Sequence, residues 1–314
     1  MDARINELRM NQNKILTGHA TGFSQEPYIG KSLMPEVKVD DTKVIIPSYA
    51  KDLFRVYQTE RALRAEAKIL DPVTYGKNEI SLFEHAIAQR LDQWEIAASS
   101  VQRLNLMKYA SMQVAEALTL GEEVRIADLV QDLSTYPTGS KVTLSGNDQW
   151  SDVNSDPLAN IDTGKEKISS LIAKYPTVIA FGHDSFNSFK AHKKVRDAIF
   201  GKDQPGIPTI PQIEALLGMK VVVGRSKYTT SADGAFINVW GDNVVMAYVP
   251  QTSADKSNLF TPSFGYSFLH NGFPIIQDFY VSGNKKVKQI EATSVSAVAV
   301  LMNNAGYIIN DTNA

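Results

Sequence analysis

The chain has 314 residues, of which 43% are hydrophobic and 21% are charged, and it carries a formal net charge of −2 and no cysteine. This composition is typical of a soluble globular protein with one large domain or two smaller ones. It excludes disulfides, thiolate chemistry and cysteine-ligated zinc sites. The net charge also excludes a protein that binds nucleic acid through an overall positive charge.

Residues 1–40 show weak periodicity and scattered glycine and proline, including Gly18, Pro27 and Pro35. Segments of this kind bury too little apolar surface to fold alone. We therefore expect an extended N-terminal arm without a core of its own.

Residues 43–78 contain two strand-like runs, 43–49 and 64–70, around a charged middle, and a turn signal follows at 71–76. The pattern predicts a long hairpin, and its seven cations and four anions give it a net charge of +3. Because a lone two-stranded hairpin is marginally stable in water, we expect this one to lie on an acidic partner surface. The cations that we expect at that contact are Arg55, Arg61, Arg64 and Lys68.

Residues 79–120 hold no glycine or proline, and their apolar residues recur at helical spacing. We predict one helix over 79–97, a break at Ser99–Ser100, and a second helix over 101–120 that ends at the capping residue Gly121. A short amphipathic segment at 122–133 follows. The apolar positions of the first helix are Ile80, Phe83, Ile87, Leu91 and Trp94.

The next part of the chain, up to residue 250, mixes strands and helices. Residues 142–162 are rich in turn residues, and Trp150 is the apolar anchor that we expect for them. Three helices are predicted, at 165–174, at 186–200 with Gly201 as its C-cap, and at 208–218. Buried strands are predicted at 177–182 and 219–224, and a hairpin is predicted from 234–240 and 244–250.

The last part of the chain is mostly strand-like, with predicted strands at 273–281, 285–292, 294–302 and 306–310. Four aromatic residues occur at strand spacing. They could line a binding site or fill a core, and this spacing favours core packing. They are Phe264, Tyr266, Phe268 and Phe273. Because strands and helices do not alternate regularly, we predict the α+β class.

His183, Asp184, Ser185 and His192 lie within ten positions and are the residue types of a hydrolytic site. The glycines that raise a serine nucleophile on a strand–helix turn are absent around Ser185. Asp184 or Ser185 is better explained as the N-cap of the following helix. A serine hydrolase using Ser185 with His183 or His192 remains the alternative of another class, and we predict no catalytic residue.

Metal and cofactor sites are not predicted. Residues 152–163 place oxygen ligands at three positions of a calcium loop, but Pro157 replaces the glycine that the loop requires and Thr163 replaces its glutamate. The five histidines do not occur at metal-binding spacing.

Four stretches, in this order, resemble those of tailed-phage major capsid proteins of the Hong Kong 97-type fold. They are LGEEVRIADLVQD (120–132), LSGNDQWSDVNSDPLANI (144–161), YPTVIAFGHDSFNSFKAHKKVRDAI (175–199) and IPQIEALLGMKVVVGRSKY (210–228). Together they carry the resemblance over about residues 79–230. The N-terminal third matches in the order of its parts more than in its residues.

The resemblance implies an N-terminal arm (1–40), an E-loop hairpin (41–78), a P-domain with a long spine helix (79–152 and 251–314) and an A-domain (153–250). It implies a major capsid protein that self-assembles into the icosahedral shell around the double-stranded DNA genome of a tailed bacteriophage, and not an enzyme. The same fold also serves encapsulin-like nanocompartments, and genomic neighbours would separate these two readings.

The partners implied by the resemblance are other copies of the chain, in hexamers and pentamers, and packaged DNA, held without sequence specificity on the inner face. A portal protein and scaffolding and decoration proteins are further implied partners. The expected location is the virion, after assembly in the host bacterial cytoplasm. We expect no cofactor, because no cofactor-binding or metal-binding motif occurs. We expect no membrane partner, because the longest apolar stretch, residues 294–302, is too short to span a bilayer.

Overall fold

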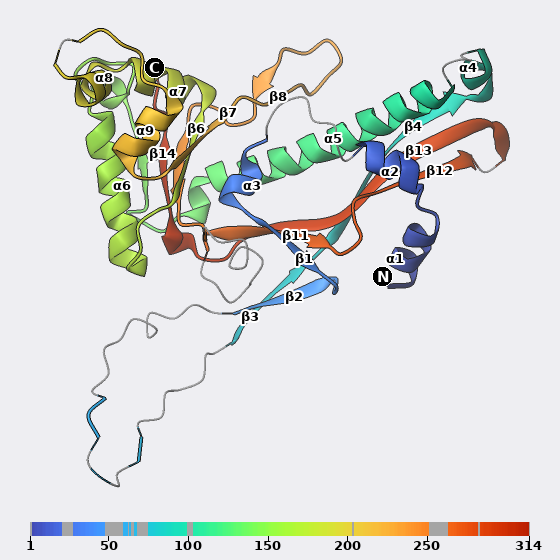
Figure 1. Ribbon diagram of the computed structural model, residues 1–314, viewed down its shortest axis with the longest axis horizontal. Coiled ribbons are helices and arrows are strands. Elements are labelled where there is room, and N and C mark those ends of the chain that lie inside the picture. Colours follow the sequence, from blue (N-terminus) through green and yellow to red (C-terminus); the bar gives the residue numbers. More distant parts are fainter. Residues whose placement is uncertain are drawn as a thin grey trace.

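Figure 1 shows a computed structural model of the chain, with a unit of helices and strands at one end and a long arm of helix and sheet extending from it. The structure describes residues 2–20, 28–47, 59–61, 63, 66–67, 75–98, 103–202, 204–250, 263–281 and 283–313. Helices and two main sheets are combined without regular alternation, which confirms the predicted α+β class.

The arm is built on helix α5, Arg103–Gln131, whose 29 residues give a length of about 44 Å. The prediction of two segments separated at Gly121 is wrong, because the helix continues through this glycine. Beyond it, Ile126, Ala127 and Val130 are fully buried, and their burial outweighs the cost of about 1 kcal/mol for an interior glycine. The predicted break at Ser99–Ser100 lies outside the described residues.

The sheet of the arm is organised around the 17-residue strand β13, Asn284–Val300. This single strand replaces the two strands predicted at 285–292 and 294–302. Ser296 pairs with Leu269 on one edge and with Phe83 on the other, so two strands lie along one edge of β13 and a third along the opposite edge. The other strands are β1 (Glu36–Val39), β4 (Phe83–Asp92), β11 (Gly265–His270) and β12 (Ile275–Val281).

The helix predicted over 79–97 is wrong, since most of this segment is strand. Strand β3 spans Tyr75–Ser81, β4 follows it, and only α4, Gln93–Ala98, is helical. A spacing of four residues puts side chains on one face of a helix and also on one face of a strand. The ten-residue ladder between β4 and β13 decides between the two.

A two-stranded ribbon leaves the arm near β1 (Figure 1). Strand β2, Lys43–Pro47, pairs antiparallel with β3, so that Lys43 lies opposite Ser81. The prediction of a hairpin is confirmed at this base, but its return strand is β3 and not residues 64–70, of which the described residues 66–67 are not strand. The turn predicted at 71–76 is also wrong at its end, because Tyr75 and Gly76 belong to β3.

The N-terminal segment forms helices α1 (Asp2–Met10), α2 (Lys14–Ala20) and α3 (Gly30–Leu33). The prediction that residues 1–40 are extended is wrong for the described residues, because they form three helices. Ile5, Leu16 and Leu33 are buried in clusters made mainly by the rest of the chain, which agrees with the prediction that this segment has no core of its own. Asn13 also donates a 2.7 Å hydrogen bond to Asp278 of β12. The sparse apolar residues suffice because the arm sheet supplies the other half of each contact.

The second sheet belongs to the unit at the end of the arm and has the order β5-β14-β10-β6-β7. The strands predicted at 177–182, 219–224 and 306–310 are confirmed. The predicted hairpin of 234–240 and 244–250 is wrong, because both edges of β10 are occupied by β6 and β14. The strands are β5 (Lys141–Thr143), β6 (Val178–Gly182), β7 (Lys220–Gly224), β10 (Val244–Ala247) and β14 (Gly306–Asn310).

Residues 234–240 instead contribute β9, Ile237–Asn238, which pairs with β8, Lys227–Tyr228, in a separate hairpin. This β8–β9 hairpin projects from the end unit over α5 (Figure 1).

Four helices pack around this second sheet: α6 (Pro157–Ile172), α7 (His183–Ala191), α8 (Lys193–Phe200) and α9 (Ile210–Leu217). Helix α6 begins well before the predicted residue 165, and the helix predicted over 186–200 is two helices divided at His192. The predicted C-cap Gly201 is confirmed. Short 3-10 helices are η2 (Leu133–Thr135), η3 (Gly146–Asp148) and η4 (Asn303–Ala305).

The largest core fills the end unit. Trp150, only 1% exposed, packs against Phe181 and Phe189 with ring centroids 6.3 and 5.5 Å away, which confirms its prediction as an anchor. All four aromatic residues predicted to fill a core, between positions 264 and 273, are buried. None of the described helices combines the length and the apolar character that crossing a bilayer requires.

Candidate functional site

The turn from β6 into α7 carries the residues that resemble a hydrolytic site. The Ser185 side chain is fully buried, with its hydroxyl oxygen 2.8 Å from Thr312 Oγ1. Neither His183 nor His192 is among the hydrogen-bond partners that the structure gives Ser185. His183 instead contacts Asn187, one turn further along the same helix. The structure therefore contradicts a Ser185–histidine pair, because neither His183 nor His192 is hydrogen-bonded to the hydroxyl.

The N-cap predicted at Asp184 or Ser185 is wrong, because α7 begins at His183 and its N-cap is Gly182. A Cβ atom at Gly182 would lie 2.0 Å from the carbonyl oxygen of Gly241. Only glycine fits this close approach of two backbones. Asp184 lies in the first turn and accepts a hydrogen bond from Asn238.

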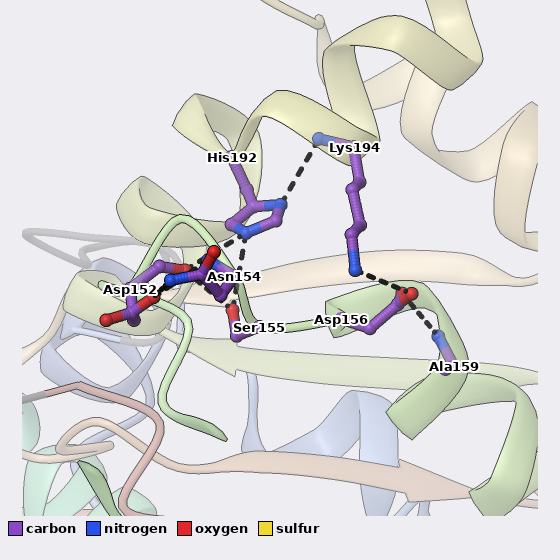
Figure 2. A network of polar contacts seen from close by, with 7 residues as sticks. All are labelled: Asp152, Asn154, Ser155, Asp156, Ala159, His192 and Lys194. Atoms are coloured by element: carbon purple, nitrogen blue, oxygen red, sulfur yellow. Dashed lines mark hydrogen bonds and ion pairs between the residues drawn. The ribbon is translucent and has the colours of Figure 1, made fainter. Parts of the chain in front are cut away.

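His192 belongs to a different network, which Figure 2 shows. Its Nδ1 accepts from the Lys194 amide at 3.3 Å and caps α8, while Nε2 lies 3.2 Å from both the Asp152 carbonyl oxygen and Ser155 Oγ. Because Nδ1 is the acceptor, Nε2 carries the ring hydrogen and donates a hydrogen bond to the Asp152 carbonyl oxygen. Burial lowers the pKa of His192, and the Lys194 ammonium adds to this effect.

Asp156 extends the same network to α6. Its carboxylate accepts from the Ala159 amide at 3.1 Å, as the N-cap of α6, and forms a 2.9 Å ion pair with Lys194. Burial acts in the opposite direction, yet Lys194 and the Ala159 amide hold the pKa of Asp156 below its ordinary value. The network joins the 152–156 loop to α6 and α8. The groups next to His192 Nε2 are the buried Ser155 hydroxyl and the Asp152 carbonyl. The role of the network is therefore to hold the loop in place.

The calcium loop considered for residues 152–163 is not formed, because its second half is the first turns of α6. Among the described residues, no group of three or more histidine, aspartate or glutamate side chains is placed to hold a metal ion.

Glu123 joins three parts of the molecule. Its carboxylate accepts hydrogen bonds from the backbone amides of Ile29 and Gly30, both at 2.9 Å, and from Trp240 Nε1 at 2.7 Å. Burial raises the pKa of this carboxyl, although the three N–H donors favour the ionised form. The N-terminal segment, the spine helix α5 and the end unit are thus tied together at one buried group. The sequence does not reveal this joint, because a glutamate inside a charged helical stretch carries no sign of burial.

Large apolar side chains remain exposed on both parts of the molecule, and those of the arm include two aromatic rings. Phe83 of β4 is 64% exposed and Trp94 of α4 is 78% exposed. No strand among the described residues pairs with the outer edge of β4. Large exposed apolar groups along an unpaired strand edge are typical of surfaces that associate with other chains.

The cations predicted at a partner contact are only partly placed. Arg55, Arg64 and Lys68 lie outside the described residues. Arg61 is described and exposed. The contact role of these four residues stays a prediction.

Comparison with known proteins places this geometry in a family. A model described as phage major capsid protein E matches residues 78–264, more than half of the chain. The chain is 32% identical over 313 residues to the major capsid protein of Burkholderia phage BcepMu, covering 99% of each chain. It is 24% identical over 240 residues to the major capsid protein of Pseudomonas phage JBD67, covering 74% of this chain and 75% of the other.

Solved structures agree with this placement. A phage-related protein from Bordetella bronchiseptica superposes with a TM-score of 0.77 at 26% identity, over 96% of this chain and 97% of that one. The mature capsid of bacteriophage PhiM1 and the SrpI encapsulin of Synechococcus elongatus give TM-scores of 0.53 and 0.51, each at 11% identity over 92% of this chain and 89% of the other. At 11% identity the likeness shows a shared fold alone, and that fold includes both phage capsids and an encapsulin.

Proposed function

The chain belongs to the phage major capsid protein E family, and we propose that its copies close into an icosahedral shell of hexamers and pentamers around the double-stranded DNA of a tailed bacteriophage. It is a phage major capsid protein with the Hong Kong 97-type fold, and its assembled form is part of the virion. The encapsulin reading rests on a distant structural likeness only. We propose that the chain has no catalytic activity, which the burial of Ser185 supports.

The observation that carries the proposal is the exposed apolar surface of an arm that is otherwise well ordered by its own sheet and helix. Phe83, Ile87 and Trp94 are 64%, 41% and 78% exposed. Contacts between different surfaces of identical subunits close into rings when the rotation between them closes. Obligate interfaces of this kind bury about 2,000–5,000 Å² or more, which an elongated arm and ribbon supply more readily than a compact unit.

We propose the division of the chain into an N-terminal arm (1–40), an E-loop (41–78), a P-domain (79–152 and 251–314) and an A-domain (153–250). In the sheet of the end unit, β5 precedes the proposed A-domain in sequence and β14 follows it. These two strands mark the border of the A-domain. In this division the ribbon β2–β3 is the base of the E-loop, and Arg55, Arg61, Arg64 and Lys68 of that loop contact the neighbouring copy.

Packaged DNA, a portal protein, and scaffolding and decoration proteins complete the proposed set of partners, with assembly in the host bacterial cytoplasm. The formal net charge of −2 supports a wall that encloses DNA without binding it tightly. A wall that neutralised many phosphates would instead bind the DNA strongly and in a salt-dependent way.

Expression of the chain followed by negative-stain electron microscopy and native mass spectrometry tests this function. We expect closed particles from the unchanged chain. The triple variant Arg55→Ala, Arg61→Ala and Arg64→Ala is expected to stay folded and to form few particles. The matched variant with lysine at the same three positions keeps the charge and is expected to assemble. A chain that stays monomeric at high concentration would overturn the proposal, and full particles from the alanine variant would overturn the contact role of the three arginines.

A further inference from the structure

The turn between β11 and β12 contains the one Asn–Gly sequence of the chain, Asn271–Gly272, and both residues are exposed. Gly272 has a positive φ of 87°, which glycine adopts without strain because it has no Cβ atom. When glycine follows asparagine, no side chain hinders the approach of the glycine nitrogen to the side-chain carbonyl carbon of the asparagine. The turn therefore places a nucleophile next to an electrophile, in contact with water.

The backbone N–H of Gly272 is available for reaction. Asn271 donates its own backbone N–H to the Val39 carbonyl oxygen at 2.7 Å, and Phe273 donates to the His270 carbonyl oxygen at 3.2 Å. Between them, the Gly272 N–H has no hydrogen-bond acceptor in the part of the chain that the structure describes. Its hydrogen can therefore be removed without breaking a hydrogen bond of the fold.

Arg9 of α1 lies against the same peptide bond. Its Nη2 donates a hydrogen bond to the Asn271 carbonyl oxygen, and His270 Nδ1 lies 3.0 Å from that oxygen. A Cβ atom at Gly272 would lie 2.9 Å from Arg9 Nε, so the guanidinium packs directly on the glycine. Loss of the Gly272 amide hydrogen places negative charge on the Asn271 carbonyl oxygen, and a cationic donor at that oxygen stabilises this charge. Arg9 therefore raises the population of the deprotonated, reactive amide.

The side chain of Asn271 is held by Asp40, whose Oδ1 accepts a hydrogen bond from Asn271 Nδ2 at 3.1 Å. Asp40 follows β1 and precedes β2, so this bond ties the end of β11 to the turn that leads into the ribbon. A carboxylate in place of the Asn271 amide has no hydrogen to donate, and it would repel the Asp40 carboxylate and attract Arg9. A change at this one side chain therefore alters contacts with both neighbours.

We propose that Asn271 is a site of spontaneous deamidation, in which Arg9 promotes attack of the Gly272 nitrogen on the Asn271 side chain. Water or hydroxide removes the Gly272 amide hydrogen, and the nitrogen electron pair forms a bond to Asn271 Cγ. The Cγ–Nδ2 bond then breaks, and Nδ2 takes up a proton from water and leaves as ammonia. The product is a five-membered succinimide ring.

Hydrolysis of the ring completes the modification. Water adds to one of the two ring carbonyl carbons, and the bond from that carbon to the Gly272 nitrogen breaks. Opening at Cγ gives aspartate, whereas opening at the backbone carbon gives isoaspartate, in which the chain continues through the former side chain. Because ammonia is lost, the modified form accumulates with the age of the chain. The new carboxylate removes the bond to Asp40 and loosens the turn between β1 and β2.

Mass spectrometry of the full-length, unassembled chain tests this inference. The chain and a synthetic peptide of residues 265–278 are incubated at mildly alkaline pH, and the chain is then digested. Fragmentation that separates aspartate from isoaspartate follows both samples with time. We expect Asn271 to convert to a mixture of the two, several-fold faster in the folded chain than in the peptide, because only the folded chain places Arg9 at the reacting amide.

Asn154 is the control within the same chain. It is also exposed, and its side-chain amide donates a 3.0 Å hydrogen bond to Asp152. The residue that follows it is Ser155, whose backbone N–H donates to the Asp152 carbonyl oxygen at 3.3 Å. Its nucleophile is therefore engaged, and we expect Asn154 to keep its amide over the same period. Conversion of Asn154 as fast as that of Asn271 would overturn the inference.

Variants at Arg9 test the promoting role. Arg9→Gln is expected to lower the rate at Asn271 to that of the peptide, and Arg9→Lys, which keeps the positive charge, is expected to lower it less. Circular dichroism checks that both variants are folded. An unchanged rate in Arg9→Gln, or an Asn271 that keeps its amide in the folded chain while the peptide converts, would overturn the inference. Because the reaction is followed in single copies, its outcome does not depend on the proposed assembly.

Discussion

Strand β6 of the end unit and strand β4 of the arm differ in how far their side chains are buried. Every residue of Val178–Gly182 is buried, whereas β4 buries Leu91 and leaves Phe83 and Ile87 exposed. Strand β6 is paired along both edges, by β10 and by β7, whereas β4 is paired with β13 along one edge. Strand β6 is therefore covered within one copy, although the end unit also exposes apolar side chains elsewhere on its surface, such as Ile207 and Phe236. The arm has apolar surface left over, which in a capsid protein is available for burial by neighbouring copies.

The largest difference in the free energy of unfolding is expected between substitutions of two tryptophans, one in the end unit and one on the arm. Trp150→Ala removes a fully buried ring from the core of the end unit and should lower the free energy of unfolding by about 3–5 kcal/mol. Trp94→Ala removes an exposed ring from α4 and should change it by no more than about 0.5 kcal/mol. Urea denaturation of unassembled protein measures both. A loss from Trp94→Ala as large as that from Trp150→Ala would remove the distinction between the regions.

The joint between the two regions gives the next effect. Glu123→Ala leaves the amides of Ile29 and Gly30 and the Trp240 indole N–H without their acceptor, and a buried donor without a partner costs about 1–3 kcal/mol. Asp128→Ala, at an exposed position of the same helix, is the matched control and should be nearly neutral. Urea denaturation at pH 7.5 compares them, and equal stability of the two variants would show that the joint does not connect the regions.

A smaller effect, within the end unit, depends on pH. Because burial lowers the pKa of His192, the folded chain favours the neutral ring. Its contribution to stability is therefore present above the unfolded pKa of about 6.5 and is lost as the pH falls toward the lower folded value. Protonation of Nδ1 also ends its acceptor role for the Lys194 amide. We expect the fall in Tm between pH 7.5 and pH 5.0 to be smaller in His192→Gln than in the unchanged chain, and identical falls would contradict this role.

The smallest effect on folding is expected on the arm. Phe83→Ser replaces an exposed ring on β4 and should leave the free energy of unfolding of single copies within about 0.5 kcal/mol, while it lowers the yield of particles in electron microscopy. Ala86→Ser, on the opposite face of the same strand, is the control and should leave the yield unchanged. Normal particle yield from Phe83→Ser would mean that neighbouring copies do not cover this edge.

The comparison of β6 with β4 also shows which elements a local pattern predicts and which it does not. In the end unit, the strands at 177–182 and 219–224 and the anchor Trp150 were all predicted, because continuous apolar runs and a lone tryptophan in a polar loop signal burial directly. In the arm, a spacing of four residues in β4 was interpreted as a helix. The deciding factor was pairing with β13, some 200 residues away in sequence, which no local pattern carries.

The polar sites show the same limit. His192 lies among hydrolytic residue types, yet its partners come from a loop about 40 residues earlier. Glu123 binds groups from residues 29–30 and from Trp240. Both roles depend on distant segments meeting in space, so the sequence predicts neither. The resemblance to capsid proteins succeeded where local patterns failed, because it describes the order of many segments at once.

Hydrogen–deuterium exchange of unassembled subunits and of assembled particles tests the central claim most directly. If neighbouring copies complete the burial of the arm, the backbone amides of β3 and β4, residues 75–92, exchange markedly more slowly in particles. Those of β6 and β10 exchange slowly in both states. Exchange in residues 75–92 that is the same in subunits and in particles would contradict the account.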